Sequence, residues 1–234
     1  MDEVPVQEVA AMLAELAEDS PTSLLHACRR LIEHFPASGQ LWWLSARALS
    51  APETVEGIWE AADELVQDPT PAALAKAVPE GASVSLLRPS SHAIVQALRP
   101  RKQAAGRPNA RPNPNARKAN DAEKRSRGTG HQLVVVPALA AGPDALLVHD
   151  AAAHQLVAHA RSGRALWAVL PKGVVLPGPL WEELLRRASA AGGTQEVAPE
   201  AFATFVGPGG LTTASDLLSA PECPPVAELL GWHS

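Results

Sequence analysis

A short turn near the middle of the chain combines one arginine with two hydroxyl side chains. The sequence Leu-Arg-Pro-Ser-Ser-His occupies residues 87–92, between an apolar run at 83–87 and a helix that we expect to end at Leu98. Where a strand leads into a helix, the first backbone N–H groups of the helix point outward and favour an anion. Arg88, Ser90 and Ser91 would therefore suit a phosphate group. The alternative is that Ser91 only caps the helix and Arg88 is solvated.

Three histidines recur at intervals of five residues, as His149, His154 and His159. A helix turns by about 100° per residue, so this spacing spreads the three rings over different faces and they cannot all bind one metal ion. A site formed by His149, Asp150 and His154 is the remaining metal candidate, and it matches no known ligand spacing. A serine nucleophile would need a base and an orienting acid, and sequence alone does not show that His92, or His149 with Asp150, approaches either serine. The sequence predicts no catalytic residue, metal or cofactor.

A glycine-rich stretch, Gly-Pro-Gly-Gly at 207–210, precedes Leu211 and two threonines. It resembles a phosphate-binding loop only loosely, because it has neither the lysine of a P-loop nor the spacing of a dinucleotide fingerprint. We interpret it as a plain turn.

The first third of the chain predicts four amphipathic helices. Apolar residues recur at helical spacing in 4–18, in a segment that begins with Ser20-Pro21, in 40–49 and in 52–67. The stripes include Met12, Trp42, Trp43, Trp59 and Val66. Such a stripe is usually core, and the alternative is that it lines a groove for a partner.

The rest of the chain predicts a small α/β domain of Rossmann-like type. Short, nearly continuous apolar runs alternate with helical segments, which is typical of a mostly parallel sheet covered on both faces. The expected division is a helical N-terminal region at 1–78 and an α/β domain at 79–234. We expect strands at 83–87, 132–137, 145–149 and 165–170, and helices at 151–162, 178–190 and 212–219.

A basic segment interrupts this domain. Residues 100–130 contain no Val, Ile, Leu or aromatic residue, so they cannot bury enough apolar surface to offset their ordering entropy, and we predict a disordered insertion. Residues 99–127 hold ten Lys and Arg against Asp121 and Glu123, a net +8, which leaves −13 for the rest of a chain of net charge −5. Contact with RNA is one function of such a segment. A solvated loop is the other interpretation, because no aromatic residue is present to stack on bases.

Composition narrows the class of protein. No apolar run reaches the roughly 20 residues that span a bilayer, and the acidic start of the chain is unlike a signal peptide, so we expect a cytoplasmic protein with no membrane contact. Cys28 and Cys223 have no cysteine or histidine at metal-binding spacing, and we expect both to be packing residues.

Three stretches, 82–98, 132–172 and 205–218, resemble in order the C-terminal domain of initiation factor 2B subunits and their relatives, which include two sugar-phosphate isomerases. The family places a serine- or cysteine-bearing turn between a strand and a helix, as at 87–92 here. A later strand ends near an acidic residue, as in Ala-Leu-Leu-Val-His-Asp at 145–150. The resemblance implies a helical N-terminal domain, a Rossmann-like domain and a homo-oligomer.

The same resemblance implies that catalysis has been lost. The isomerases of the family use a cysteine on the first turn, and Pro89 occupies that position here; proline is neither an acid nor a nucleophile. Our leading hypothesis is a non-catalytic initiation factor 2B-like protein that assembles and senses a sugar phosphate or nucleotide. Arg88, Ser90 and Ser91 would hold the phosphate, and Asp150 would face a ribose hydroxyl. The alternatives are a sugar-phosphate isomerase with a rearranged site and an RNA-binding accessory protein acting through the insertion.

Overall fold

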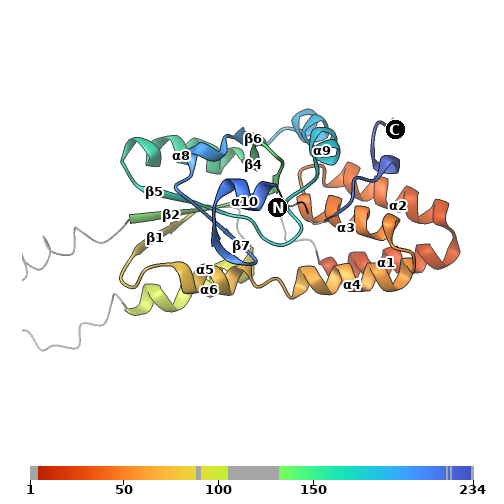
Figure 1. The fold of residues 1–234 in the computed structure, drawn as a ribbon, viewed down its shortest axis with the longest axis horizontal. Helices are drawn as coiled ribbons and strands as arrows, with labels where there is room; N and C mark the ends of the chain where they lie inside the picture. Colours follow the sequence, from red (N-terminus) through yellow and green to blue (C-terminus); the bar gives the residue numbers. More distant parts are fainter. Residues whose placement is uncertain (1–4, 88–90, 105–131, 220, 222, 233–234) are drawn as a thin grey trace, which may run out of the picture.

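Four helices form one end of the molecule and a sheet with its covering helices forms the other (Figure 1). The computed structural model describes residues 5–87, 91–104, 132–219, 221 and 223–232. The four helices confirm the predicted helical front and are α1 (Val6–Asp19), α2 (Pro21–His34), α3 (Gly39–Ser50) and α4 (Thr54–Val66).

Capping and core burial explain why these residues form helices. Ser20 Oγ accepts a hydrogen bond from the N–H of Ser23 at 3.0 Å, and Pro21 begins α2, where its missing N–H costs nothing. Trp42 and Trp43 are fully buried, as their spacing predicts.

Three other members of the predicted stripes are not core residues. Met12, Trp59 and Val66 are 42%, 41% and 55% exposed. Each lies at the flank of its helix rather than at the centre of the buried face, which is formed by neighbours such as Leu13 and Ile58.

The main sheet has the strand order β1-β2-β5-β7-β8, and its first four strands are parallel. This confirms the mostly parallel sheet, although β7 and the antiparallel β8 were not predicted. The strands are β1 (Ser83–Leu86), β2 (Gln132–Pro137), β5 (Ala165–Val169), β7 (Thr204–Gly207) and β8 (Gly210–Thr212).

Helices cover both faces of this sheet. Successive side chains of a strand point to opposite faces, so adjacent residues of β2 show what packs on each face. In β2, Val134 and Val136 share a buried cluster with Ala152, Ala153 and Leu156 of α8 (Asp150–Arg161). The alternate residues Leu133 and Val135 share another cluster with α5 (Thr70–Ala77) and α6 (His92–Ala104), through residues such as Leu74 and Ile94. Therefore α8 lies on one face, and α5 and α6 lie on the other.

The segment predicted as a strand at 145–149 does not join the main sheet. It forms β4 (Leu146–His149) in a second, antiparallel sheet with β3 (Ala140–Ala141) and β6 (Thr194–Val197). The reason is the length of the connection. A parallel crossover needs about a dozen residues, whereas the chain reverses after β3 through a turn in which the N–H of Gly142 bonds to the carbonyl of Ala145.

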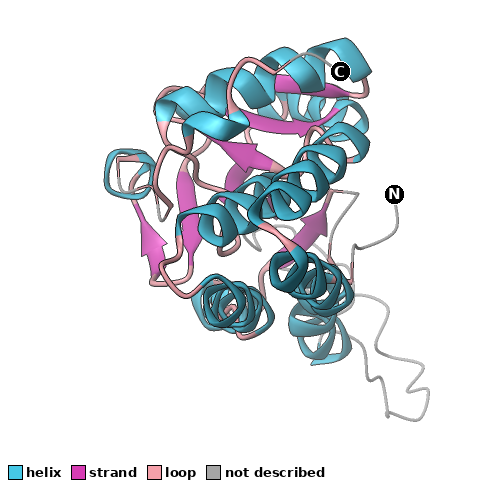
Figure 2. Ribbon diagram, turned by 90° about the vertical axis from the view of Figure 1, so that its right-hand side faces the viewer, coloured by secondary structure: helices cyan, strands magenta, loops and turns pink. Residues whose placement is uncertain are grey.

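A shared core joins the helical end to the rest of the chain. The cluster around Trp42 and Trp43 also contains Leu176 and, from α9 (Gly178–Ala191), Leu180 and Trp181. Figure 2 shows α9 and the four N-terminal helices in front of the sheet. The packing therefore continues across residue 78, where the sequence suggested a division.

Trp232, near the C-terminus, packs between α2 and α9 beside this shared core. Trp232 stacks against Arg187 of α9, with the guanidinium carbon 3.5 Å from the ring centroid, and its indole N–H donates to Glu33 of α2 at 3.1 Å. Two short helices complete the C-terminal part, α10 (Ala214–Leu218) and the 3-10 helix Ala227–Leu229, after a 3-10 turn at Pro199–Ala201.

Both cysteines are buried, as expected of packing residues. Burial raises the pKa of Cys28 to about 12, so its thiol stays protonated at neutral pH. No helix within the described ranges is both long enough and apolar enough to cross a bilayer.

The predicted insertion at 100–130 lies outside the described residues except for 100–104. Those five residues extend α6 beyond the predicted end at Leu98, and they include Pro100, which has no N–H for the helical hydrogen bond.

Candidate functional site

Of the predicted phosphate-binding turn, Ser91 falls within the described residues, whereas Arg88 and Ser90 do not. Ser91 Oγ accepts a hydrogen bond from the N–H of Ile94 at 3.3 Å, and the Ser91 carbonyl accepts one from the N–H of Val95 at 3.1 Å. These are the contacts of a helix-capping residue at the start of α6. The phosphate-binding role of the turn stays a prediction.

Asp150 is half-buried and begins α8 directly after β4. Its backbone N–H bonds to the carbonyl of Gly193, and its carbonyl lies 2.7 Å from Nδ1 of His154. Because α6 and α8 cover opposite faces of the main sheet, Ser91 and Asp150 begin helices on opposite sides of it. No hydrogen bond joins them among the described residues, and the described geometry does not bring the two together.

The carboxyl edge of the parallel strands is where open α/β sheets bind ligands. Here the described residues that follow these strands are mainly apolar. Leu87 follows β1, Ala138 and Leu139 follow β2, and Leu170 and Pro171 follow β5; Leu87, Ala138 and Leu170 are buried. Lys172 is the one charged side chain among the described residues directly after the four parallel strands.

The start of α3 lies directly on this edge. The N–H of Gly39 donates to the carbonyl of Leu139 at 2.9 Å, and Gln40 Nε2 donates to the carbonyl of Lys172 at 3.0 Å. A Cβ on residue 39 would lie 2.9 Å from the Leu139 oxygen, so glycine permits this approach. The helical region thus occupies the ends of β2 and β5.

Lys172 belongs to a polar cluster between the two parts of the molecule. Its Nζ lies 3.1 Å from Glu64 Oε2, and Arg47 Nη2 lies 3.0 Å from Glu64 Oε1. Both cations also lie over the ring of Trp43, at 5.8 and 5.5 Å from its centroid. The glutamate balances one of two positive charges, and the cluster holds α3 and α4 against the loop after β5.

Sequence reasoning missed this cluster. Arg47 and Glu64 are charged residues on amphipathic helices, where a charged side chain is usually solvated. Their partner Lys172 is more than a hundred residues away in sequence, and a single sequence contains no signal for that pairing.

The three histidines have separate partners. His149 Nδ1 accepts from the N–H of Ala151 and caps α8, and His159 Nδ1 lies 2.9 Å from Arg164 Nη1. Among the described residues, no three His, Cys, Asp or Glu side chains converge as a metal site would require.

The glycine-rich stretch at 207–210 is the turn between β7 and β8, in which Gly207 pairs with Gly210. Gly210 has a φ of 99°, a conformation that favours glycine. The interpretation as a plain turn is confirmed.

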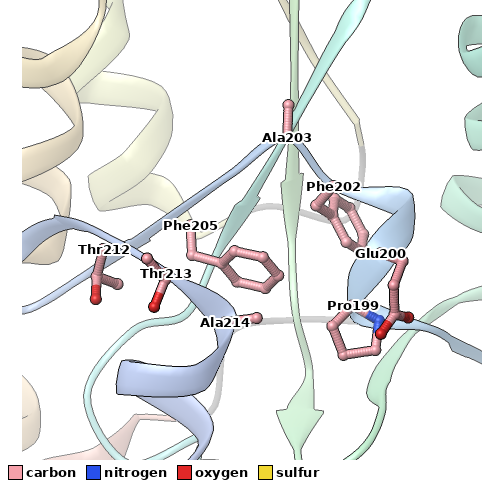
Figure 3. A pocket seen from close by; sticks show the side chains of 8 residues that line it. All are labelled: Pro199, Glu200, Phe202, Ala203, Phe205, Thr212, Thr213 and Ala214. Atoms are coloured by element: carbon pink, nitrogen blue, oxygen red, sulfur yellow. The ribbon is translucent and has the colours of Figure 1, made fainter.

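Two open hollows lie at the other end of the parallel strands. The first, of about 260 Å³, has Phe202 and Phe205 in edge-to-face contact at 5.9 Å between centroids, with Glu200 and Thr213 at its rim (Figure 3). The second, of about 310 Å³, adjoins Gln132 and Ala165, where β2 and β5 begin. Gln132, Ser162 and Arg164 are the polar residues that line the second hollow.

Comparison with known proteins gives a fold and no close relative. No family model matches the sequence, and no curated protein does. A chain of the tetrameric eIF2B-beta2-delta2 complex from C. thermophilum matches 92% of this chain and 87% of its own length, with 17% identity and a TM-score of 0.61. The eIF2B beta subunit from Chaetomium thermophilum covers 89% of this chain and 80% of its own, with 16% identity and a TM-score of 0.56.

The translation initiation factor eIF-2B of Pyrococcus horikoshii OT3 matches 93% of this chain and all of its own length, with 10% identity and a TM-score of 0.53. At identities this low, the TM-scores establish a shared fold and no more. The resemblance expected from the residues is therefore confirmed at the level of fold, over far more of the chain than the three stretches that suggested it.

Two glycines in the left-handed region test the contact between the helical region and the sheet edge. At Gly173, with φ 79°, a Cβ would lie 2.7 Å from Leu65 Cδ2 and 3.3 Å from Trp43; at Gly163, with φ 68°, it would meet nothing. We expect Gly163→Ala to cost about 1 kcal/mol from backbone strain alone. Gly173→Ala should cost about 1–3 kcal/mol more, because the core must move. Urea unfolding of both variants measures the difference, and equal losses would contradict the tight packing.

Proposed function

We propose that this chain is a non-catalytic protein of initiation factor 2B type, whose α/β part serves in assembly with other chains and in recognition of a sugar phosphate or nucleotide. The observation that carries the non-catalytic part is that α3 covers the carboxyl ends of β2 and β5. Acid–base and nucleophilic catalysis both need a titratable or nucleophilic group next to the substrate. The described residues directly after β2 and β5 offer one such group, Lys172, and it is already paired with Glu64.

Two features support the assembly part. The fold matches a chain of a complex described as tetrameric, over most of the length of both chains. The outer strand β1 also pairs with β2 alone among the described strands, and it is a short strand of small and apolar residues without a charge. An uncharged edge strand presents unpaired N–H and C=O groups with which a strand of another chain can pair.

The ligand-recognition part rests on the turn at 88–91. Arg88, Ser90 and Ser91 supply one cation and two hydroxyls at the start of α6, where the helix dipole favours an anion. Asp150, at the start of a helix on the opposite face, is the member of the predicted set that the geometry supports least.

Assembly and the lack of catalysis can be measured on the same preparation. We expect sedimentation equilibrium of the full chain to give a mass at least twice that of the 24.5 kDa monomer. We also expect no turnover of methylthioribose-1-phosphate or ribose-1,5-bisphosphate. A monomer at every concentration would contradict assembly. Turnover that disappears in Asp150→Asn would replace the proposal with an isomerase.

Ligand recognition is tested by thermal unfolding with pentose phosphates and nucleotides. A ligand at a hundred times its Kd stabilises the native state by about 2.7 kcal/mol and raises Tm. We expect Arg88→Ala and Ser91→Ala to lose this shift and Asp150→Asn to keep it. If no compound raises Tm in the unmodified chain, the recognition part is wrong.

A second candidate function is binding of RNA, and the net charge of +8 in 99–127 is the observation that favours it. Neutralised phosphates release counterions, so the affinity for a single-stranded RNA should fall steeply with salt. A variant without residues 105–130 should lose the salt-dependent binding, as measured by fluorescence anisotropy. Unchanged binding in that variant would exclude this function for the segment.

A further inference from the structure

The outward faces of α1 and α4 carry acidic residues and no basic ones. Each helix has four Asp or Glu residues and neither Lys nor Arg. Of these eight acidic residues, Glu64 forms ion pairs within the chain, with Arg47 and Lys172. The other seven are exposed, and within the described part of the chain none of them forms an ion pair. They are Glu8, Glu15, Glu18, Asp19, Glu56, Glu60 and Asp63.

Large apolar side chains lie among these carboxylates. On α1, Met12 shares one stripe with Glu8, Glu15 and Asp19, because residues three, four and seven positions apart stack on a helix. On α4, Trp59, Asp63 and Val66 form a similar stripe, and the two helices pack side by side (Figure 1). Met12, Trp59 and Val66 are 42%, 41% and 55% exposed. They are three of the five large apolar side chains exposed in the described residues.

This combination of charge and apolar surface restricts what can bind. The carboxylates repel nucleic acid and anionic lipid surfaces. They attract Lys and Arg, and an exposed Trp ring also offers a face to a guanidinium. Trp59 and Met12 add apolar contact of the kind that anchors protein interfaces. We propose that the acidic face of α1 and α4 docks a basic polypeptide segment of a partner protein, one that also presents bulky apolar residues.

The chain itself does not offer such an occupant. Its basic segment at 99–127 has the right charge but contains no Val, Ile, Leu, Met or aromatic residue to cover Trp59. The remainder of a second copy has a net charge of −13 and would be repelled by this face. The occupant is therefore a segment of another protein, and this inference does not depend on the function proposed above.

Two fluorescein-labelled synthetic helices of equal length and equal positive charge test the proposal on the full chain. One is an amphipathic Leu/Lys peptide, and the other has alanine in place of each leucine. We expect the Leu/Lys peptide to bind at least tenfold more tightly by anisotropy. Trp59→Ala should weaken its binding about tenfold and change the binding of the Ala/Lys peptide little. Leu211→Ala removes an apolar residue of β8 that is more exposed than Trp59, at 55% against 41%, and should change neither.

The charge requirement has its own matched control. Neutralising Glu15, Glu60 and Asp63 to their amides should weaken both peptides and flatten the salt dependence. The same change at Glu80, Asp144 and Glu196, exposed acids outside α1 and α4, should leave binding as it was. Equal losses in the two triple variants, or equal binding by Trp59→Ala and the unmodified chain, would overturn the proposal. Urea midpoints establish that each variant is folded.

A last variant tests the basic segment. Replacing 105–131 by a neutral Gly/Ser stretch of the same length should leave peptide binding unchanged, or tighten it if the segment competes for the face. Loss of binding would show that the segment is required and would also overturn the proposal.

Discussion

The contact between the start of α3 and the ends of β2 and β5 is the constraint on which the arrangement of this molecule depends. Gly39 approaches the backbone of Leu139 so closely that a side chain would not fit, and its N–H bonds there. Around that point, Trp43 packs against Gly173 and Leu65, and one core extends from α1 through Leu180 of α9. Burial of a large side chain in such a core contributes about 1.5–3 kcal/mol. The helical front and the α/β part are therefore stabilised together.

This contact also covers part of the edge at which open parallel sheets bind ligands. In open parallel sheets the carboxyl ends of the strands leave a crevice, and the residues beside it bind and transform ligands. Here α3 covers the ends of β2 and β5, and Lys172 pairs with Glu64 across the contact, whereas Ser91 and His92 lie after β1 at the start of α6. A residue type suited to catalysis is thus used to hold two parts together. The two open hollows lie at the opposite ends of the strands.

Charge is distributed unevenly over the molecule. Residues 99–127 are strongly basic, whereas α1 and α4 have no basic residue at all. Charges attract groups of opposite sign over long range, so the proposed partners are a polyanion for the segment and a basic polypeptide for the helices. The fold itself is shared with eIF2B chains at low identity, and a shared fold does not fix what a surface binds.

The sequence by itself determined the elements with strong local patterns. Apolar periodicity predicted all four N-terminal helices, the strands β1, β2 and β5, and the burial of Trp42 and Trp43. It did not predict β6, whose Thr-Gln-Glu-Val sequence is mostly polar, or that 146–149 would leave the main sheet, because strand pairing depends on connection geometry. Only the tertiary structure decided that Ser91 and Asp150 begin helices on opposite faces, that Glu64 pairs with Lys172, and that Trp59 is exposed. Local periodicity reports which face of a helix is apolar, whereas these outcomes depend on which distant residues pack against it.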